Sequence, residues 1–230
     1  MSRNLFLAVI LLVASSFFWS GNFFSGKIAF LSDLTPFKLS FFRWLLALTI
    51  LLPFTYSQIL KDINYYKNNL LLMTTIAILG VTIFNSFTYI SLRTTMVINS
   101  TLMASVAPVM MIGFSWLIFR TKTTTLQFAG ILLSLLGVFA IILKGNLNNL
   151  YNLYFTSGDL WMLAAVISWC LYSVLLRKID SNTSQLANLE VMIIIGIIFI
   201  FPFYILESNN TSYLPSTGLD LAIISYVAIF

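Results

Sequence analysis

The chain has 230 residues, of which 60% are hydrophobic and only 8% are charged, and its mean hydropathy is +0.97. Soluble domains carry about 25% charged residues, so this composition excludes an ordinary water-soluble globule. The net charge of +5 does not indicate nucleic-acid binding, because the basic residues are scattered over short loops. Histidine is absent and Cys170 is the single cysteine, which excludes an internal disulfide, His-based metal sites and Ser-His catalysis. We therefore expect neither an enzyme nor a bound cofactor or metal.

Continuous apolar runs dominate the sequence. A helix that crosses a bilayer needs roughly 20 mainly apolar residues, whereas the strands of a membrane β-barrel alternate apolar and polar residues. The sequence therefore predicts an all-α fold, a polytopic transmembrane helical bundle. The predicted spans are Leu5–Phe24, Phe37–Tyr56, Leu70–Ile90, Val97–Phe119, Leu126–Leu143, Leu160–Leu176 and Leu186–Leu206, and an eighth apolar run opens near Leu219 and reaches Phe230.

The first span has some features of a secretory signal, with Arg3 before an apolar core and Ala14-Ser15-Ser16 after it. Because the apolar run continues through Phe23 and Phe24, we interpret it as a retained helix.

The second span begins after Pro36, a usual place for proline at a helix start, and contains Arg43 about two turns further on. A charge at that depth is costly unless it faces the bundle interior or extends to the membrane interface. Both interpretations stay open.

The fourth span contains Pro108, which removes a backbone hydrogen bond and predicts a kink. The kink either opens beside a substrate cavity or only improves packing.

Several motifs resemble a known family. The first span carries Trp19-Ser20-Gly21-Asn22, and later motifs follow in the order Tyr89-Ile-Ser-Leu-Arg93, Ala107-Pro108-Val109, Gln127-Phe-Ala-Gly130 and a helix closing on Gly137. This order resembles the drug/metabolite transporter superfamily, EamA type. The family usually has Gly-Glu-Arg where this chain has Arg120-Thr121-Lys122, so a role of that acidic residue cannot be transferred here.

The later part of the sequence repeats features of its start. Trp169 follows Trp19 by 150 residues, Arg177 follows Lys27 by the same distance, and Glu190 stands within three residues of the position equivalent to Arg43. Because five spans separate the copies, the second copy would enter the membrane from the opposite side, as in the inverted repeats of secondary transporters. The resemblance implies five plus five helices. We therefore expect residues 1–145 to form a first EamA repeat and residues 158–230 a partial second one, in a chain truncated at its C-terminus.

Polar and aromatic side chains inside the spans are candidates for a substrate cavity. Aromatic rings suit the apolar part of an organic solute, and amides and hydroxyls orient its polar end, although such residues also pack and anchor membrane helices. The candidates are Trp19, Asn22, Phe23, Arg43, Asn85, Tyr89, Asn99, Met103, Trp169 and Tyr172.

These observations predict an integral membrane secondary transporter whose partners are the lipid bilayer and a small organic solute. The resemblance favours export of a metabolite such as an amino acid by alternating access. Proton coupling is not favoured, because histidine is absent and Glu190 is the only acidic residue within a span. Seven basic residues on one side against four on the other predict a cytoplasmic N-terminus in the plasma (inner) membrane. The alternative is a transport-inactive fragment, or a subunit that needs a partner chain or a second copy.

Overall fold

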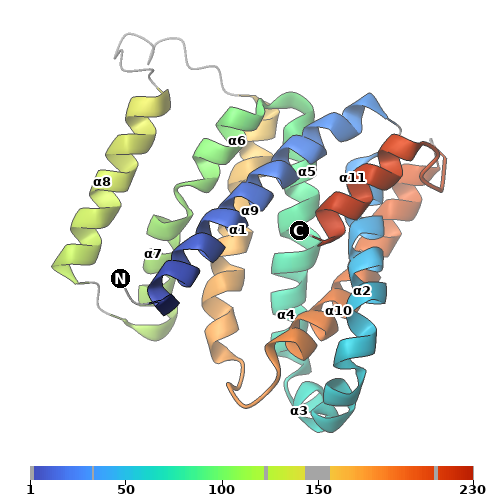
Figure 1. The fold of residues 1–230 in the computed structure, drawn as a ribbon, viewed down its shortest axis with the longest axis horizontal. Coiled ribbons are helices and arrows are strands. Elements are labelled where there is room, and N and C mark those ends of the chain that lie inside the picture. Colours follow the sequence, from blue (N-terminus) through green and yellow to red (C-terminus); the bar gives the residue numbers. More distant parts are fainter. Residues whose placement is uncertain (1–2, 33, 122–123, 143–155, 210–211, 230) are drawn as a thin grey trace.

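The structure is a computed structural model that describes residues 3–32, 34–121, 124–142, 156–209 and 212–229. These residues form a bundle of helices (Figure 1), which confirms the predicted fold class. The helices are α1 (Arg3–Ile28), α2 (Pro36–Lys61), α3 (Ile63–Asn68), α4 (Leu70–Ala77), α5 (Phe84–Thr94), α6 (Val97–Ala104), α7 (Ala107–Phe119), α8 (Thr125–Ile142), α9 (Ser157–Leu175), α10 (Gln185–Ser208) and α11 (Gly218–Ile229), with short 3-10 turns η1 (Ala29–Leu31) and η4 (Leu176–Lys178) and the π-helical segment η2 (Ile78–Ile83).

Six helical stretches among the described residues are long and apolar enough to cross a membrane. Two further apolar helices follow the predicted runs closely: α8 covers Thr125–Ile142 and α11 covers Gly218–Ile229. Lys122 and Phe230 lie outside the described residues. The six long stretches are Leu5–Leu31, Pro36–Lys61, Leu70–Thr94, Val97–Phe119, Ser157–Lys178 and Gln185–Ser208.

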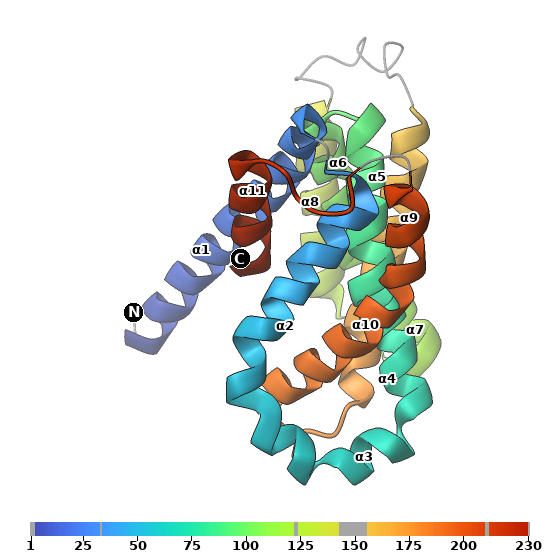
Figure 2. The same cartoon turned by 90° about the vertical axis from the view of Figure 1, so that its right-hand side faces the viewer.

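Successive long helices run in alternating directions, as short connections between membrane spans require (Figures 1 and 2). The centre of the bundle is formed by α2, α5, α9 and α10, with α10 packed against α2 and α9 packed between α5 and α7. Helix α8 lies at the edge beside α6, and the N-terminal half of α1 extends away from the other helices (Figures 1 and 2). The central four helices therefore supply most of the interior surface.

Aromatic rings fill the interface between α2 and α10. Phe41 stacks on Tyr204 with ring centroids 4.5 Å apart, and Phe37 stacks on Phe203 at 5.1 Å. Such ring pairs contribute about 0.5–1.5 kcal/mol each beyond their buried area. They hold one end of α10 firmly against the start of α2.

The ends of several helices are fixed by polar contacts on the side of the bundle opposite α3. Lys27 Nζ donates to the carbonyls of Leu92 (2.7 Å) and Thr95 (3.1 Å), which places a cation at the negative C-terminal end of α5. At the start of α9, the Thr156 backbone N–H donates to Asp159 Oδ2 at 2.7 Å within a capping box. These caps satisfy backbone groups that a helix leaves unpaired at its ends.

The fourth predicted span is interrupted. Helix α6 ends at Ala104, α7 begins at Ala107, and Pro108 lies in the first turn of α7, where proline costs no helical hydrogen bond.

The other end of α7 is capped by Arg120, whose φ of 55° is left-handed. Most helices that end this way use glycine, the residue that stands here in the family pattern.

Candidate functional site

Arg43 lies at the centre of a hydrogen-bonded network that joins three helices. Its Nη1 atom donates to Asn85 Oδ1 at 2.6 Å and to Tyr89 Oη at 2.8 Å, and the Tyr89 hydroxyl donates to Asn22 Oδ1 at 2.9 Å. Asn22 comes from α1, Arg43 from α2, and Asn85 and Tyr89 from α5. The Arg43 side chain is 8% exposed, so it points into the bundle and does not extend to the membrane interface.

The sequence of the third span positions both partners of Arg43. Asn85 and Tyr89 are four residues apart on α5 and therefore lie on one face of that helix. The Asn85 amide nitrogen donates to the Gly80 carbonyl at 3.0 Å, which turns the amide oxygen toward Arg43. Gly80 belongs to η2, and such π-helical segments are frequent at functional sites. The irregular backbone and the polar network are thus directly connected.

A cavity of about 230 Å³ lies beside this network. Trp169 is central to its aromatic wall: its ring centroid is 4.6 Å from that of Phe84, 5.1 Å from that of Tyr172 and 6.0 Å from that of Trp19. Polar groups and aromatic rings therefore share one enclosure, the arrangement expected of a small-molecule site. The lining residues are Trp19, Asn22, Arg43, Trp44, Gly80, Val81, Phe84, Asn85, Trp169, Tyr172 and Leu189.

The shape of this cavity depends on the missing side chain of Gly80. A Cβ atom added at Gly80 would collide with the ring of Tyr172. Because Tyr172 comes from α9 and Gly80 from η2, the glycine allows these two segments to approach closely. The position of the Tyr172 ring in the cavity wall follows from that approach.

Seven of the ten predicted site residues come together here. Six line the cavity, and Tyr89 joins through its hydrogen bonds. The other three lie elsewhere. Phe23 lines a neighbouring cavity of about 240 Å³, Met103 packs against a hydrophobic cluster, and Asn99 is half-buried on α6 outside the lining of both cavities. The residues in the cavity are Trp19, Asn22, Arg43, Asn85, Trp169 and Tyr172.

The predicted kink at Pro108 also lies away from the Arg43 cavity. The Pro108 side chain is exposed. The interruption before it borders the neighbouring cavity, which Ser105 lines together with Trp19 and Phe23. Trp19 therefore stands between the two cavities, with its ring in the wall of both.

Five lining residues were not among the predicted ones. Trp44 follows Arg43 directly and Phe84 precedes Asn85, so adjacency to predicted residues was a usable signal. Gly80, Val81 and Leu189 carry no polar or aromatic group, and only the packing of η2 and α10 brings them to the site.

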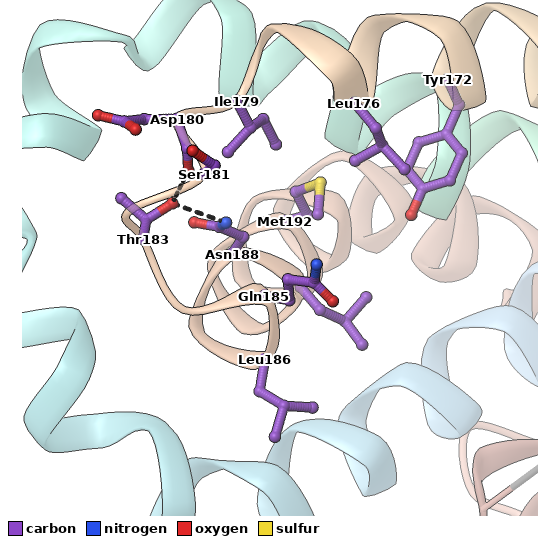
Figure 3. A pocket seen from close by; sticks show the side chains of 11 residues that line it. Tyr172, Leu176, Ile179, Asp180, Ser181, Thr183, Gln185, Leu186, Asn188 and Met192 are labelled. Carbon is purple, nitrogen blue, oxygen red and sulfur yellow. Dashed lines mark hydrogen bonds between the residues drawn. The ribbon is translucent and has the colours of Figure 1, made fainter. Parts of the chain in front are cut away.

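A larger pocket of about 600 Å³ lies between the end of α9 and the start of α10. Figure 3 shows Tyr172 at one end of it and the turn from Asp180 to Thr183 at the other. Tyr172 and Leu189 line both this pocket and the Arg43 cavity, so the two spaces share a wall. Sequence reasoning did not identify this pocket.

Asn188 gives the larger pocket an ordered polar group. Its amide nitrogen donates to Thr183 Oγ1 at 2.9 Å, and its oxygen accepts from the Tyr66 hydroxyl at 3.0 Å. Burial raises the pKa of the Tyr66 phenol to about 12, with a further contribution from Asp62. Tyr66 therefore remains a neutral donor at physiological pH.

Glu190 lies in different surroundings. Its side chain is fully buried in α10, and neither carboxyl oxygen has a hydrogen-bond partner in the described part of the chain. The described residues also contain no group of three or more His, Cys, Asp or Glu side chains that could hold a metal ion.

The bundle of membrane-crossing helices defines an integral membrane protein, and the polar-aromatic cavity is its candidate site for a small solute. The EamA-like transporter family matches residues 6–143, more than half of the sequence, and the chain belongs to this family. It is a membrane transporter of the drug/metabolite transporter superfamily and not an enzyme.

Curated relatives agree with this assignment. The chain is 27% identical over 230 residues to an uncharacterized transporter of Archaeoglobus fulgidus, a match that covers 94% of the chain and 74% of the relative. It is 23% identical over 204 residues to the uncharacterized transporter YyaM of Bacillus subtilis, covering 88% of the chain and 66% of YyaM. It is 28% identical over 132 residues to YetK of the same organism, covering 57% of the chain and 40% of YetK. No solved structure matches the chain.

Proposed function

We propose that the chain is a secondary transporter that exports a small organic metabolite, such as an amino acid, through the Arg43 cavity. The observation that carries this proposal is a buried arginine held by Asn85 and Tyr89 beside a cavity of about 230 Å³ with aromatic walls. A charged side chain inside a membrane protein is expensive and is usually retained for function. Substrate binding at Arg43 is the function that accounts for it best.

Alternating access between two inverted repeats is the proposed mechanism. In its support, α1 and α9 run in opposite directions (Figure 1), and Trp19 and Trp169, the repeat-related tryptophans, lie 6.0 Å apart in the cavity wall. Secondary transporters often place their substrate site at the interface between such repeats. Tyr172 and Leu189 form the wall between the cavity and the larger pocket, and a movement of this wall would open or close the path of the solute between them.

The proposed orientation has a cytoplasmic N-terminus in the plasma (inner) membrane. The basic residues Lys61, Lys67, Arg177 and Lys178 lie near α3 or in η4, at the same end of the bundle. Basic loops are enriched on the cytoplasmic side of membrane proteins. The larger pocket borders η4 and the loop that follows it, so in this orientation it opens toward the cytoplasm, as uptake of a solute for export requires.

The test is efflux of a labelled amino-acid and metabolite panel from cells that express the chain. Arg43→Ala is expected to lower efflux of the transported solute by about tenfold or more, because a charge-assisted hydrogen bond contributes about 1.5–3 kcal/mol. Lys61→Ala is the matched control, since Lys61 is an exposed cation on the same helix. Equal efflux by the wild type, Arg43→Ala and Lys61→Ala would overturn the site assignment. Equal efflux with and without the chain would overturn the transport proposal.

A further inference from the structure

The positive charge of Arg43 has no acidic counterpart around the cavity. No aspartate or glutamate is among the lining residues, and the salt bridge in the described part of the chain joins Arg93 to Glu207, at 3.6 Å. The guanidinium carbon lies 4.7 Å from the centroid of the Trp44 ring, a cation–π contact that stabilises the charge without neutralising it. The cavity therefore carries one uncompensated positive charge in a desolvated interior, where a negative partner is strongly favoured.

One nitrogen of the guanidinium is held by hydrogen bonds, and a second is buried without a partner among the described residues. Both hydrogen bonds to Asn85 and Tyr89 leave from Nη1, and Nε is buried without an acceptor among the described residues. Nε and Nη2 form a planar edge of an arginine, and such an edge binds the two oxygens of a carboxylate through parallel hydrogen bonds. Because Nη1 is already oriented by Asn85 and Tyr89, the guanidinium needs little further ordering when its unpaired Nε edge binds.

The remaining lining limits the size and shape of the solute. A volume of about 230 Å³ is below the usual range of roughly 300–1,000 Å³ for sites of drug-sized ligands, so the solute is small. The rings of Trp19, Trp169 and Tyr172 pack against one another and form an aromatic wall that suits an apolar group. An ammonium group would find no carboxylate in this lining, and it would add a second positive charge to the enclosure.

From these observations we propose that the solute is a small organic monoanion, in which a carboxylate pairs with the unsatisfied Nε edge of Arg43 and an apolar body lies against the tryptophans. This inference rests on the proposed function and narrows it from organic metabolites in general to carboxylic acids without a balancing ammonium. A zwitterionic amino acid satisfies the arginine but leaves the cavity with a net positive charge.

The experiment is a binding titration of the purified full chain in detergent at pH 7, followed by tryptophan fluorescence. Four probes share one phenyl ring: phenylacetate, phenylacetamide, phenylalanine and phenethylamine. We expect phenylacetate to bind with a Kd about tenfold or more below that of each of the other three, since an anion–guanidinium pair is roughly twice as strong as a neutral hydrogen bond. Equal or tighter binding of the amine or the amino acid overturns the proposal.

Two variants test whether Arg43 is the cause. Arg43→Gln is expected to abolish the preference for phenylacetate over phenylacetamide. Asn85→Asp is nearly isosteric and supplies the carboxylate that the cavity lacks, so it retains a partner for Arg43 and should weaken phenylacetate binding by about tenfold. A preference that survives both substitutions in folded protein overturns the assignment.

The outcomes also separate this inference from the proposed function. If none of the four probes binds, the monoanion assignment is wrong, and the transport proposal stands or falls with the efflux panel. If phenylalanine binds and is exported while phenylacetate is not, transport is supported and the monoanion class is rejected.

Discussion

Arg43 and Glu190 are predicted to lie within three residues of equivalent positions in two sequence repeats, and their surroundings differ. Arg43 is hydrogen-bonded by Asn85 and Tyr89 and borders a cavity, whereas Glu190 is fully buried and its carboxyl oxygens have no partner among the described residues. The Arg43 region therefore has the properties of a binding site, and the Glu190 region those of an apolar packing interface that contains one ionisable group.

The difference extends to what each part of the chain contributes. Residues before position 145 supply the polar groups of the cavity, including Asn22, Arg43 and Asn85, while α9 and α10 supply Trp169, Tyr172 and Leu189. In the proposed function, an asymmetric cavity of this kind would orient a solute that has one polar end. The following three substitutions test the contrast, in decreasing order of expected effect.

The hydrogen bonds of Tyr89 carry the largest expected effect. Tyr89→Phe removes the hydroxyl that accepts from Arg43 and donates to Asn22, so we expect the protein to lose about 1.5–3 kcal/mol of stability. Thermal unfolding in detergent measures the change. Tyr56→Phe is the control, because Tyr56 is exposed on α2. If both variants unfold at the same temperature, the network contributes nothing measurable.

The contact between Gly80 and Tyr172 should have a similar or slightly smaller effect. Gly80→Ala forces a Cβ atom against the Tyr172 ring, and overpacking of this kind costs about 1–3 kcal/mol. Gly113→Ala is the matched control, since no atom lies within 4 Å of an added Cβ there. The double variant Gly80→Ala, Tyr172→Ala should unfold nearer to Tyr172→Ala alone than additivity predicts. An effect of Gly80→Ala no greater than that of Gly113→Ala contradicts this account.

Replacement of Glu190 should have the smallest effect. Glu190→Gln keeps the shape of the side chain and breaks no ion pair or hydrogen bond of the described residues, so we expect it to destabilise the protein less than Tyr89→Phe or Gly80→Ala does. Phenylacetate binding should stay within about twofold of the wild type, in contrast to the loss expected for Arg43→Gln. The phenylacetate titration, followed by tryptophan fluorescence, measures the Kd of the Glu190→Gln protein. A large loss of binding in a stable Glu190→Gln protein would show that the two regions are coupled.

Much of the candidate site was predictable from residue types. Arg43, Asn22, Asn85 and Tyr89 are polar groups within apolar spans, and lipid leaves such groups few places to point other than the interior. Asn99 was chosen on the same argument, yet it lies outside the lining of both cavities beside Trp19. A polar residue type marks Asn99 as an interior residue, but it does not specify which neighbouring helix or cavity the side chain faces.

Other lining residues could not be predicted because they are ordinary apolar or small residues. Leu189 and Val81 reach the cavity only through the packing of α10 against α2 and η2. The π-helical turn of η2 has no clear sequence signal, although it decides where the Gly80 carbonyl meets the Asn85 amide. Such contacts depend on helix rotation and spacing.

The sequence by itself determined that this protein is a bundle of membrane-crossing helices, because a long apolar segment in lipid must satisfy its backbone hydrogen bonds internally. It also determined the family, through the order of its motifs along the spans. Only the tertiary structure decided which polar side chains meet, that Arg43 faces a cavity while Glu190 is sealed, and that Tyr172 stands between two pockets. The helices are apolar on most faces, so close packing, and not the hydropathy pattern, sets their rotation.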